Sequence, residues 1–536
     1  MMKKNLSRLC ALTLFMAVCM QWVSAQNPYL PLWEFIPDGE PYLFEDPDKP
    51  GEYRVYIYGS HDMLKTEYCG RDQVVWSAPV NDLTSWRYDG IIFKSERDAN
   101  GNLLNEGGIA DVLYAPDVAL KTNPDGTKTY YLYPNNQAGG RQTMVAKSDR
   151  PDGPFEVCNW SKDNPRETTG ILHFDPAAFV DDDGRAYAYW GFGESEAAEL
   201  DPSTMCTLKP GTDIIKNMVA GYKQDEQFRF YEASSIRKIK DKYVFVYSRW
   251  THEGEFDLPG SNYTLAYAYS DHPLGPWTYG STIIDGRARG KDVNGKTIPT
   301  ASSTGNTHGS ILEINGKWWV FYHRQTGSNE FSRQAMVAPI EVKVEEGKGG
   351  KVTISEGEYT SEGFATDGLN PLHRTPAGLA CYLIGPKPDE VEFPNKRHFG
   401  SYLQPVYLDP DSYQGPNSQK VPFMPVVNNT DGSTVGYKYF NFDELGKKPS
   451  VSLSLRLKPL GIDGEIEILV GSPYKEKGGK SVGRVDIKSN MPQEMTELSV
   501  PLSGIYGMTG KQAVYFLFTS GTKERPVCDL YDFMFK

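Results

Sequence analysis

Five residues with acid–base side chains each open a short apolar segment of the chain. They are Glu40 in GEPYLF, Asp117 in APDVAL, Asp175 in FDPAAFV, Glu232 in YEASSI and His308 in THGSIL. Carboxylates and imidazoles are common proton donors and acceptors in catalysis. Successive members are 77, 58, 57 and 76 residues apart. A single Asp before proline is usually a turn former, so the inference of a shared site rests on the repetition.

The elements that would position these residues are short strands. Aromatic and β-branched runs recur up to residue 345 as YRVYIYGS, TYYLYP, RAYAYWG, YVFVYS and KWWVFYH, each bounded by Gly, Pro, Asn or Asp. Such runs are typical of β-strands. The phrase Ser-Asp-x-Pro-x-Gly-Pro-aromatic occurs within 147–155 and again within 269–277. Five repeated units predict an all-β fold, a five-bladed β-propeller over residues 26–345, whose innermost strands line one central channel.

Composition limits the function classes. The chain has 536 residues and a net charge of −13, with 52 Gly, 37 Pro and 33 Tyr. This length predicts two or three domains. The acidic balance argues against nucleic-acid binding, which needs a basic surface. No apolar segment of membrane-spanning length follows the N-terminal region. There is no glycine-rich phosphate loop before a helix, so we expect no nucleotide, flavin or redox cofactor.

The N-terminus has the pattern of an export signal. Lys3, Lys4 and Arg8 precede the apolar run ALTLFMAVCM, and Val23-Ser24-Ala25 fits a cleavage site. We therefore predict a signal peptide over residues 1–25 and a periplasmic or extracellular protein. The five cysteines beyond it are scattered, and we expect buried thiols rather than a disulfide scaffold.

The region of about 30–345 resembles family 43 glycoside hydrolases. The matching phrases are LYAPDV at 113–118, FDPAAFVDDDGRAYAYWG at 174–191, YEASSIRK at 231–238, THGSI at 307–311 and YHR at 322–324. The resemblance implies a five-bladed propeller that hydrolyses glycosides with inversion and requires no cofactor. It implies arabinofuranosides, xylosides or arabinans of plant polysaccharide as substrates, with galactosides in some branches.

Catalytic roles follow from this resemblance by position. Glu232 matches the general acid, and Asp117 matches the carboxylate that modulates the pKa of the acid. Glu40 is expected to be the general base, because it precedes a proline where most relatives have Asp-Pro. Asp38 is the alternative base, since residues two apart in a strand face the same side. An inverting pair lies about 6.5–9.5 Å apart, and burial or a nearby negative charge should keep the acid protonated.

Four further residues are expected to bind substrate. Arg324 matches an arginine that holds sugar hydroxyls in relatives, and His308 matches a central histidine. Asp175 either binds substrate or organises the channel floor. Trp190 is selected as a stacking platform for sugar from a group that also contains Tyr114, Phe179 and Trp250, although most aromatics in a β-protein belong to the core.

The C-terminal third differs in composition. Residues 346–374 read as a hairpin and linker, and residues 375–536 as a β-sandwich. The phrases VGYKYFNF and AVYFLF resemble family 6 carbohydrate-binding modules, which often hold a structural calcium ion. The alternative is a packing domain that binds nothing.

Three hypotheses of function therefore stand. The first is a glycosidase that releases arabinofuranosyl or xylosyl units. The second is a galactosidase with the same fold. The third is a carbohydrate-binding propeller without catalysis, which the replacement of the usual Asp by Glu40 keeps open.

Overall fold

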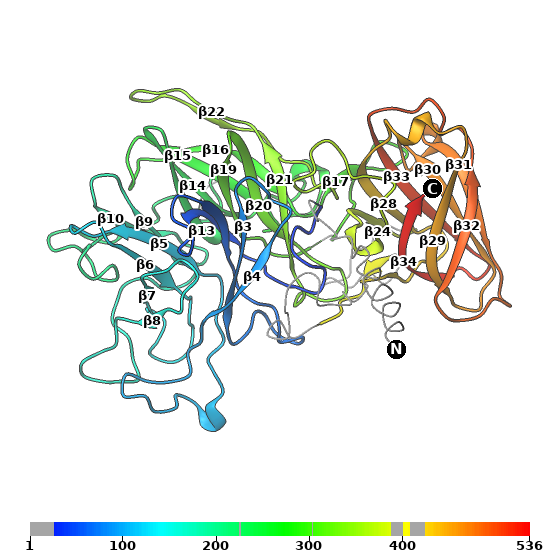
Figure 1. Ribbon diagram of the computed structural model, residues 1–536. Coiled ribbons are helices and arrows are strands. Elements are labelled where there is room, and N and C mark those ends of the chain that lie inside the picture. The colour runs from blue at the N-terminus through cyan, green and yellow to red at the C-terminus, as the bar shows by residue number, and fades with distance from the viewer. Residues whose placement is uncertain (1–25, 225–226, 303, 387–399, 408–423) are drawn as a thin grey trace, which may run out of the picture.

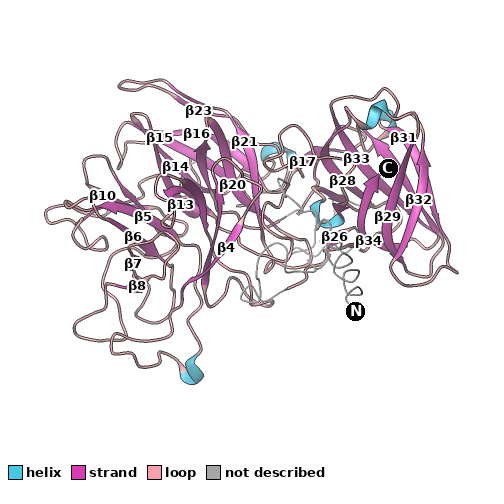
Figure 2. Cartoon of the chain, in the orientation of Figure 1, coloured by secondary structure: helices cyan, strands magenta, loops and turns pink. Residues whose placement is uncertain are grey.

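A computed structural model describes residues 26–224, 227–302, 304–386, 400–407 and 424–536. Almost all regular structure in these residues is β-strand, and the helices described are single turns of 3-10 helix (Figure 2). A propeller and a smaller sandwich lie side by side (Figure 1). No helix in the described part of the chain has the length and apolar character to cross a membrane. The predicted signal peptide, residues 1–25, lies outside the described residues.

The propeller consists of five antiparallel sheets, as predicted. The first blade contains β1 (Glu40–Glu45), β2 (Tyr53–Tyr58), β3 (Gln73–Pro79) and β4 (Arg87–Phe93). The second contains β5 (Asp117–Thr122), β6 (Lys128–Tyr133), β7 (Ala146–Ser148) and β8 (Glu156–Val157). The third contains β9 (Ala177–Val180), β10 (Ala186–Trp190), β11 (Glu196–Leu200) and β12 (Ile215–Lys216). The fourth contains β13 (Phe230–Ile239), β14 (Lys242–Arg249), β15 (Thr264–Ser270) and β16 (Thr278–Asp285).

The fifth blade closes the ring with three strands, β19 (Ser310–Ile314), β20 (Lys317–Arg324) and β21 (Gln334–Ile340). The segment ahead of β1 runs beside β21. The Asn27 side-chain amide donates to the Val337 carbonyl over 2.6 Å, and the Val337 amide donates back over 3.0 Å. The innermost strands then form a ring, because β5 contacts β9, β9 contacts β13, β13 contacts β19 and β19 contacts β1. The Tyr42 hydroxyl of β1 donates to Asp117 of β5 over 2.6 Å and completes it.

Strand alternation explains why the blades stack. In β2, Val55 and Ile57 pack with Phe321 and Val337 of the fifth blade. The intervening Tyr56 and Tyr58 point to the other face and pack in a separate core with residues of the second blade, including Leu132. Successive side chains of a strand point to opposite faces. Both faces of β2 are therefore buried, which accounts for its nearly continuous apolar run.

The C-terminal domain is a sandwich of two antiparallel sheets. One contains β24 (Thr375–Pro376), β26 (Tyr402–Leu403), β27 (Val426–Val427), β29 (Val451–Pro459), β32 (Thr496–Leu502) and β34 (Cys528–Phe535). The other contains β25 (Tyr382–Ile384), β28 (Thr434–Asn441), β30 (Gly464–Val470), β31 (Lys480–Ile487) and β33 (Lys511–Ser520). The preceding hairpin, β22 (Val342–Val344) with β23 (Val352–Ile354), begins four residues before the predicted linker.

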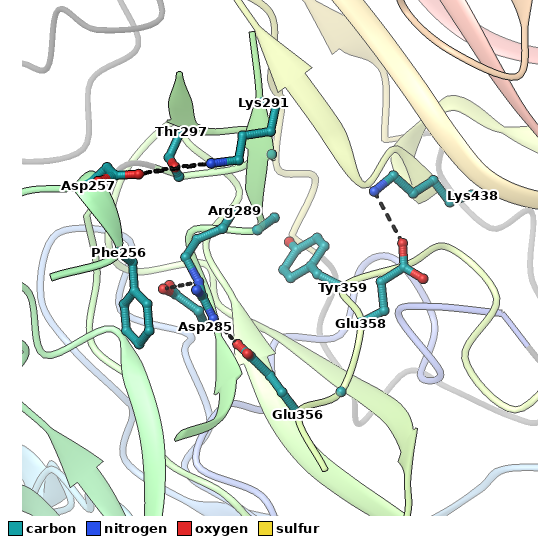
Figure 3. A pocket seen from close by; sticks show the side chains of 13 residues that line it. Phe256, Asp257, Asp285, Arg289, Lys291, Thr297, Glu356, Glu358, Tyr359 and Lys438 are labelled. Atoms are coloured by element: carbon teal, nitrogen blue, oxygen red, sulfur yellow. Dashed lines mark hydrogen bonds and ion pairs between the residues drawn. The ribbon is translucent and has the colours of Figure 1, made fainter. Parts of the chain in front are cut away.

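The two domains share a contact surface. Ile298 of the hairpin β17 (Arg289–Lys291) and β18 (Thr297–Pro299) packs with Tyr382 and Tyr515 of the sandwich. A charged pocket lies beside this contact, and its residues pair with one another (Figure 3). Arg289 lies 3.1 Å from Asp285 and also pairs with Glu356, while Lys438 of the sandwich lies 3.3 Å from Glu358. The pocket therefore belongs to the domain junction.

The thiols follow the sequence prediction with one exception. All five described cysteines are free, and four are buried. Cys158 is exposed, so the prediction of burial was wrong there. Among the described residues, no group of three or more His, Cys, Asp or Glu side chains is arranged to hold a metal ion. The described part of the sandwich thus does not offer a carboxylate-rich cluster that would fit the calcium ion implied by the resemblance.

Candidate active site

The propeller brings its titratable residues together in the central channel. Each of β1, β5, β9, β13 and β19 is the first strand of its blade, so all five begin at the same end. Asp38 and Asp175 come just before β1 and β9, and Glu232 lies near the start of β13. His308 comes just before β19. The repetition seen in the sequence therefore corresponds to spatial convergence.

Asp38 is held as a carboxylate by a network from the fifth blade. Its φ of 60° is in the left-handed region, which a non-glycine residue adopts at an energetic cost. Burial is the largest influence and tends to raise the pKa of Asp38, but the Arg333 guanidinium, 3.2 Å away, the neighbouring histidines and a hydrogen bond together outweigh it, and the pKa lies below its ordinary value. The Ser60 hydroxyl donates to the same carboxylate. Asp38 is therefore ionised at neutral pH.

His323 fixes the backbone of Asp38. The Asp38 amide donates to Nδ1 of His323 over 3.2 Å, and Nε2 of the same ring lies 2.9 Å from the Asn306 carbonyl. With Nδ1 accepting, the proton must be on Nε2. Burial lowers the pKa of His323 to about 3, so the ring is neutral. This anchoring accounts for the persistence of the left-handed conformation at Asp38.

Asp175 also has left-handed backbone, with φ 47°. Its carboxylate accepts hydrogen bonds from the Asn135 side-chain amide at 2.8 Å and from the Ala233 amide at 3.1 Å. Ala233 follows Glu232 directly, so this bond ties Asp175 to the backbone of that residue. Burial, together with the charge of Asp38, raises the pKa of Asp175 to about 6.

Glu232 has the carboxyl group of the channel that most readily holds a proton. Its side chain is partly exposed in the channel. Burial first, and then the negative charges of Asp175 and Asp38, raise the pKa of Glu232 to about 8. An ionised Asp38 beside a protonated Glu232 gives one proton acceptor and one proton donor in the same site. Two carboxyl groups whose environments separate their pKa values can act as base and acid.

Glu40 and Asp117 form a second cluster. Glu40 is fully buried; its carboxylate accepts from Arg237 at 2.7 Å and from the Ser235 hydroxyl at 3.1 Å. Asp117 accepts from the Tyr42 hydroxyl at 2.6 Å and from the Ala178 amide at 2.7 Å. Burial and the charge of Glu40 raise the pKa of Asp117 to about 7. In the described part of the chain, the hydrogen bonds of both carboxylates are thus made to residues other than Glu232.

His308 connects the two clusters. Its Nε2 lies 3.6 Å from Glu40, and its Nδ1 lies 3.9 Å from Asp175. Both distances exceed those of a hydrogen bond, so the contacts are electrostatic. Burial opposes a charge on the ring, but Glu40, Asp175 and Asp38 outweigh it and raise the pKa of His308 to about 9. The imidazolium is therefore surrounded by three carboxylates.

Two predicted substrate-binding residues lie elsewhere. Trp190 is 1% exposed, and its indole donates to Glu196 over 2.6 Å. Arg324 is 1% exposed and donates to Gln334 and to the carbonyls of Gly378 and Ala380 in the C-terminal domain. Neither can meet a sugar. Trp190 packs in the core because its strand is buried on both faces, and Arg324 joins the two domains.

Arg333 is a residue of the candidate site that the sequence did not predict. It contacts Asp38 across 295 positions of the chain and also donates to Asp62 at 2.8 Å. Its sequence context, SRQAM at the start of β21, has none of the repeated features of the inner strands. Arg333 meets Asp38 only because the fifth blade packs against the first, and no local pattern in the sequence indicates that contact.

The chain is similar to characterised proteins over this region. A family model described as glycosyl hydrolases family 43 matches residues 39–346, which include every strand of the five blades. A xylosidase/arabinosidase of Thermoclostridium stercorarium is 35% identical over 433 residues, covering 77% of this chain and 82% of its own length. The arabinoxylan arabinofuranohydrolase of Bacillus subtilis (strain 168) is 25% identical, covering 87% of this chain and 85% of its own.

The chain is also similar to solved structures. The crystal structure of a family 43 arabinoxylan arabinofuranohydrolase from Bacillus subtilis in complex with cellotetraose has 22% sequence identity and a TM-score of 0.45, with 95% of this chain and 97% of that chain covered.

Proposed function

Because the chain belongs to glycosyl hydrolase family 43, we propose that it hydrolyses xylosyl or arabinofuranosyl linkages in xylan- or arabinoxylan-derived carbohydrate, with inversion. The similarity to a protein named xylosidase/arabinosidase, at 35% identity, supports this substrate class. The channel site supports it chemically, because an inverting hydrolase needs one ionised and one protonated carboxyl group.

The roles that fit the geometry differ in part from those expected from the sequence. We propose Asp38 as general base, Glu232 as general acid and Asp175 as the residue that raises the pKa of Glu232. Asp38 takes a proton from water, and the water oxygen forms a bond to the anomeric carbon. Glu232 gives its proton to the glycosidic oxygen as the bond from that oxygen to the anomeric carbon breaks. Asp38 thus replaces Glu40, and Asp175 replaces Asp117.

One observation carries this assignment. Asp175 is bonded to the backbone next to Glu232, and the charges of Asp175 and Asp38 both raise the pKa of Glu232, whereas Glu40 and Asp117 are tied to Arg237 and Tyr42. A base that must accept a proton from water needs an accessible lone pair. Glu40, at 0% exposure, does not provide one, whereas Asp38 keeps 4% exposure beside the partly exposed Glu232.

The function is tested by incubating the purified full chain and its Glu232→Gln variant with arabinofuranosyl, xylosyl and galactosyl oligosaccharides. We expect release of xylose or arabinose and a loss in the variant of at least ~100-fold, the low end for general acid–base catalysis. Proton NMR of the first product anomer should show inversion. Galactose release alone would favour the galactosidase hypothesis. Sugar binding without release would favour the non-catalytic propeller.

Two further proposals rest on the sequence alone. We propose that residues 1–25 direct export, which mass spectrometry of the N-terminus of the secreted protein would test. We also propose that residues 375–536 bind carbohydrate, on their resemblance to family 6 modules. Retention of a catalytically inactive Glu232→Gln protein on insoluble xylan, compared with its retention on an unrelated resin, would test that proposal.

A further inference from the structure

Aromatic side chains gather at the mouth of the channel beside the proposed acid. Phe192 contacts Phe174 and Tyr231, with ring centroids 5.1 and 5.0 Å apart. Tyr231 contacts Tyr222 at 5.3 Å and Trp250 at 4.9 Å. Phe192 is 56% exposed, and the other four rings are partly exposed. We call Phe192, Tyr222, Tyr231 and Trp250 the aromatic ladder.

Topology places the ladder next to the catalytic residues. Tyr231 directly precedes Glu232 in β13, and Trp250 directly follows β14, the antiparallel partner of β13. Phe192 lies two residues beyond the end of β10, the partner of β9, before which Asp175 stands. Ends of antiparallel partners lie at the same edge of a sheet. All these rings are therefore at the end of the channel where Glu232 is reached.

The turn that carries Phe192 is built to expose it. Gly191 and Gly193 have φ of 138° and 73°. A Cβ on Gly191 would lie 2.0 Å from the Glu194 carbonyl, and a Cβ on Gly221 would lie 2.2 Å from the Gly193 carbonyl. The Gly193 amide also donates to the Tyr231 carbonyl over 2.6 Å. A closely packed turn thus holds a large apolar ring in solvent, where the ring does not contribute to core packing.

We propose that the aromatic ladder binds the leaving-group portion of the substrate, the pyranosyl unit of a polysaccharide chain that lies beyond the scissile bond. The inference rests on the proposed function, with Glu232 as acid. The acid delivers its proton to the oxygen that departs with the leaving group, so apolar rings beside the acid face that group. Pyranose rings present C–H faces that pack on aromatic rings. The ladder therefore favours oligosaccharides over substrates with small leaving groups.

The test compares Phe192→Ala with the unmodified chain on two substrates of the same sugar. One is a linear xylo-oligosaccharide carrying the sugar, and the other is its glycosyl fluoride, whose leaving group is a single atom. We expect kcat/KM on the oligosaccharide to fall about 10-fold, consistent with the loss of one stacking contact. The fluoride should be hydrolysed at an unchanged rate, and Phe192→Trp should restore the oligosaccharide rate. Tyr53→Ala, which removes a 46% exposed ring at the start of β2, the end of the first blade away from Asp38, is the matched control and should change neither.

An equal loss on both substrates would overturn the inference, because it would assign Phe192 a structural role. An unchanged oligosaccharide rate would overturn it as well. If the unmodified chain hydrolyses neither substrate, the proposed function fails, and this outcome is distinct from a failure of the ladder.

Discussion

Asp38 and Glu40 are two residues apart and both are ionised, yet their surroundings give them different chemistry. Asp38 contacts Arg333 and neighbours a partly exposed acid. Glu40 is enclosed by Arg237, Ser235 and His308. At this scale the partners of each carboxylate, rather than its type, indicate its role.

The pH profile should distinguish Asp175 from Asp117 as the residue that modulates the acid. Glu232 is active when protonated, so kcat/KM should fall as pH rises through about 8. Removing the negative charge in Asp175→Asn makes Glu232 easier to ionise, which moves the alkaline limb to lower pH by about one unit or more. Asp117→Asn, the matched control, should leave that limb in place. A limb that moves only in Asp117→Asn would reinstate the sequence-based assignment.

The two base candidates should differ in both rate and stability. Asp38→Asn should lose on the order of 100-fold or more in kcat with a small change in melting temperature, because Arg333 keeps its bond to Asp62. Glu40→Gln weakens the ion pair between the fully buried Glu40 and Arg237, and breaking a buried ion pair costs about 3–5 kcal/mol. Glu40→Gln should therefore lower the melting temperature more than Asp38→Asn does, and it should lower kcat at 25 °C less than Asp38→Asn does. The reverse pattern would identify Glu40 as the base.

At the scale of elements, the guanidinium of Arg324 holds β20 and the segment around Gly378 together. Arg324 at the end of β20 donates to three buried oxygens, which belong to the Gln334 side chain and to the Gly378 and Ala380 carbonyls. Arg324→Met should lower the free energy of unfolding by about 2–5 kcal/mol, because those acceptors lose their donor. Thermal denaturation would measure this loss of stability. KM should stay unchanged, because Arg324 does not face the channel. Arg185→Met, at an exposed pair with Asp183, is the control; a raised KM in Arg324→Met would restore its predicted sugar contact.

At the scale of the whole molecule, the sandwich is joined to the propeller by packing as well as by Arg324. Ile298 is fully buried against Tyr382 and Tyr515, and the Leu383 amide donates to the Thr300 carbonyl over 2.6 Å. Leu32 and Phe35, which precede the first blade, belong to the core of the sandwich. Domains joined by an apolar interface do not behave as independent units.

The two domains should consequently unfold together. Scanning calorimetry should show one transition, and Ile298→Ala should move the whole transition, since truncating a buried Ile costs about 2–5 kcal/mol. Val293→Ala, at a 38% exposed position of the same hairpin, should leave it unchanged. Two separate transitions, with only one sensitive to Ile298→Ala, would contradict a single cooperative unit.

The sequence by itself determined the strands, the five repeats and the convergence of Asp175, Glu232 and His308, because alternation and turn residues act locally and a repeat implies a common position in each blade. It did not determine which carboxylates form the proposed catalytic site. Alternation along a strand suggested that Asp38 and Glu40 face alike, but Asp38 lies before β1 with φ 60° and turns toward other partners. Those partners, Arg333 and His323, come from the fifth blade, 295 and 285 residues further along the chain. Only ring closure brings them to Asp38, and contacts made by closure leave no local pattern in the chain.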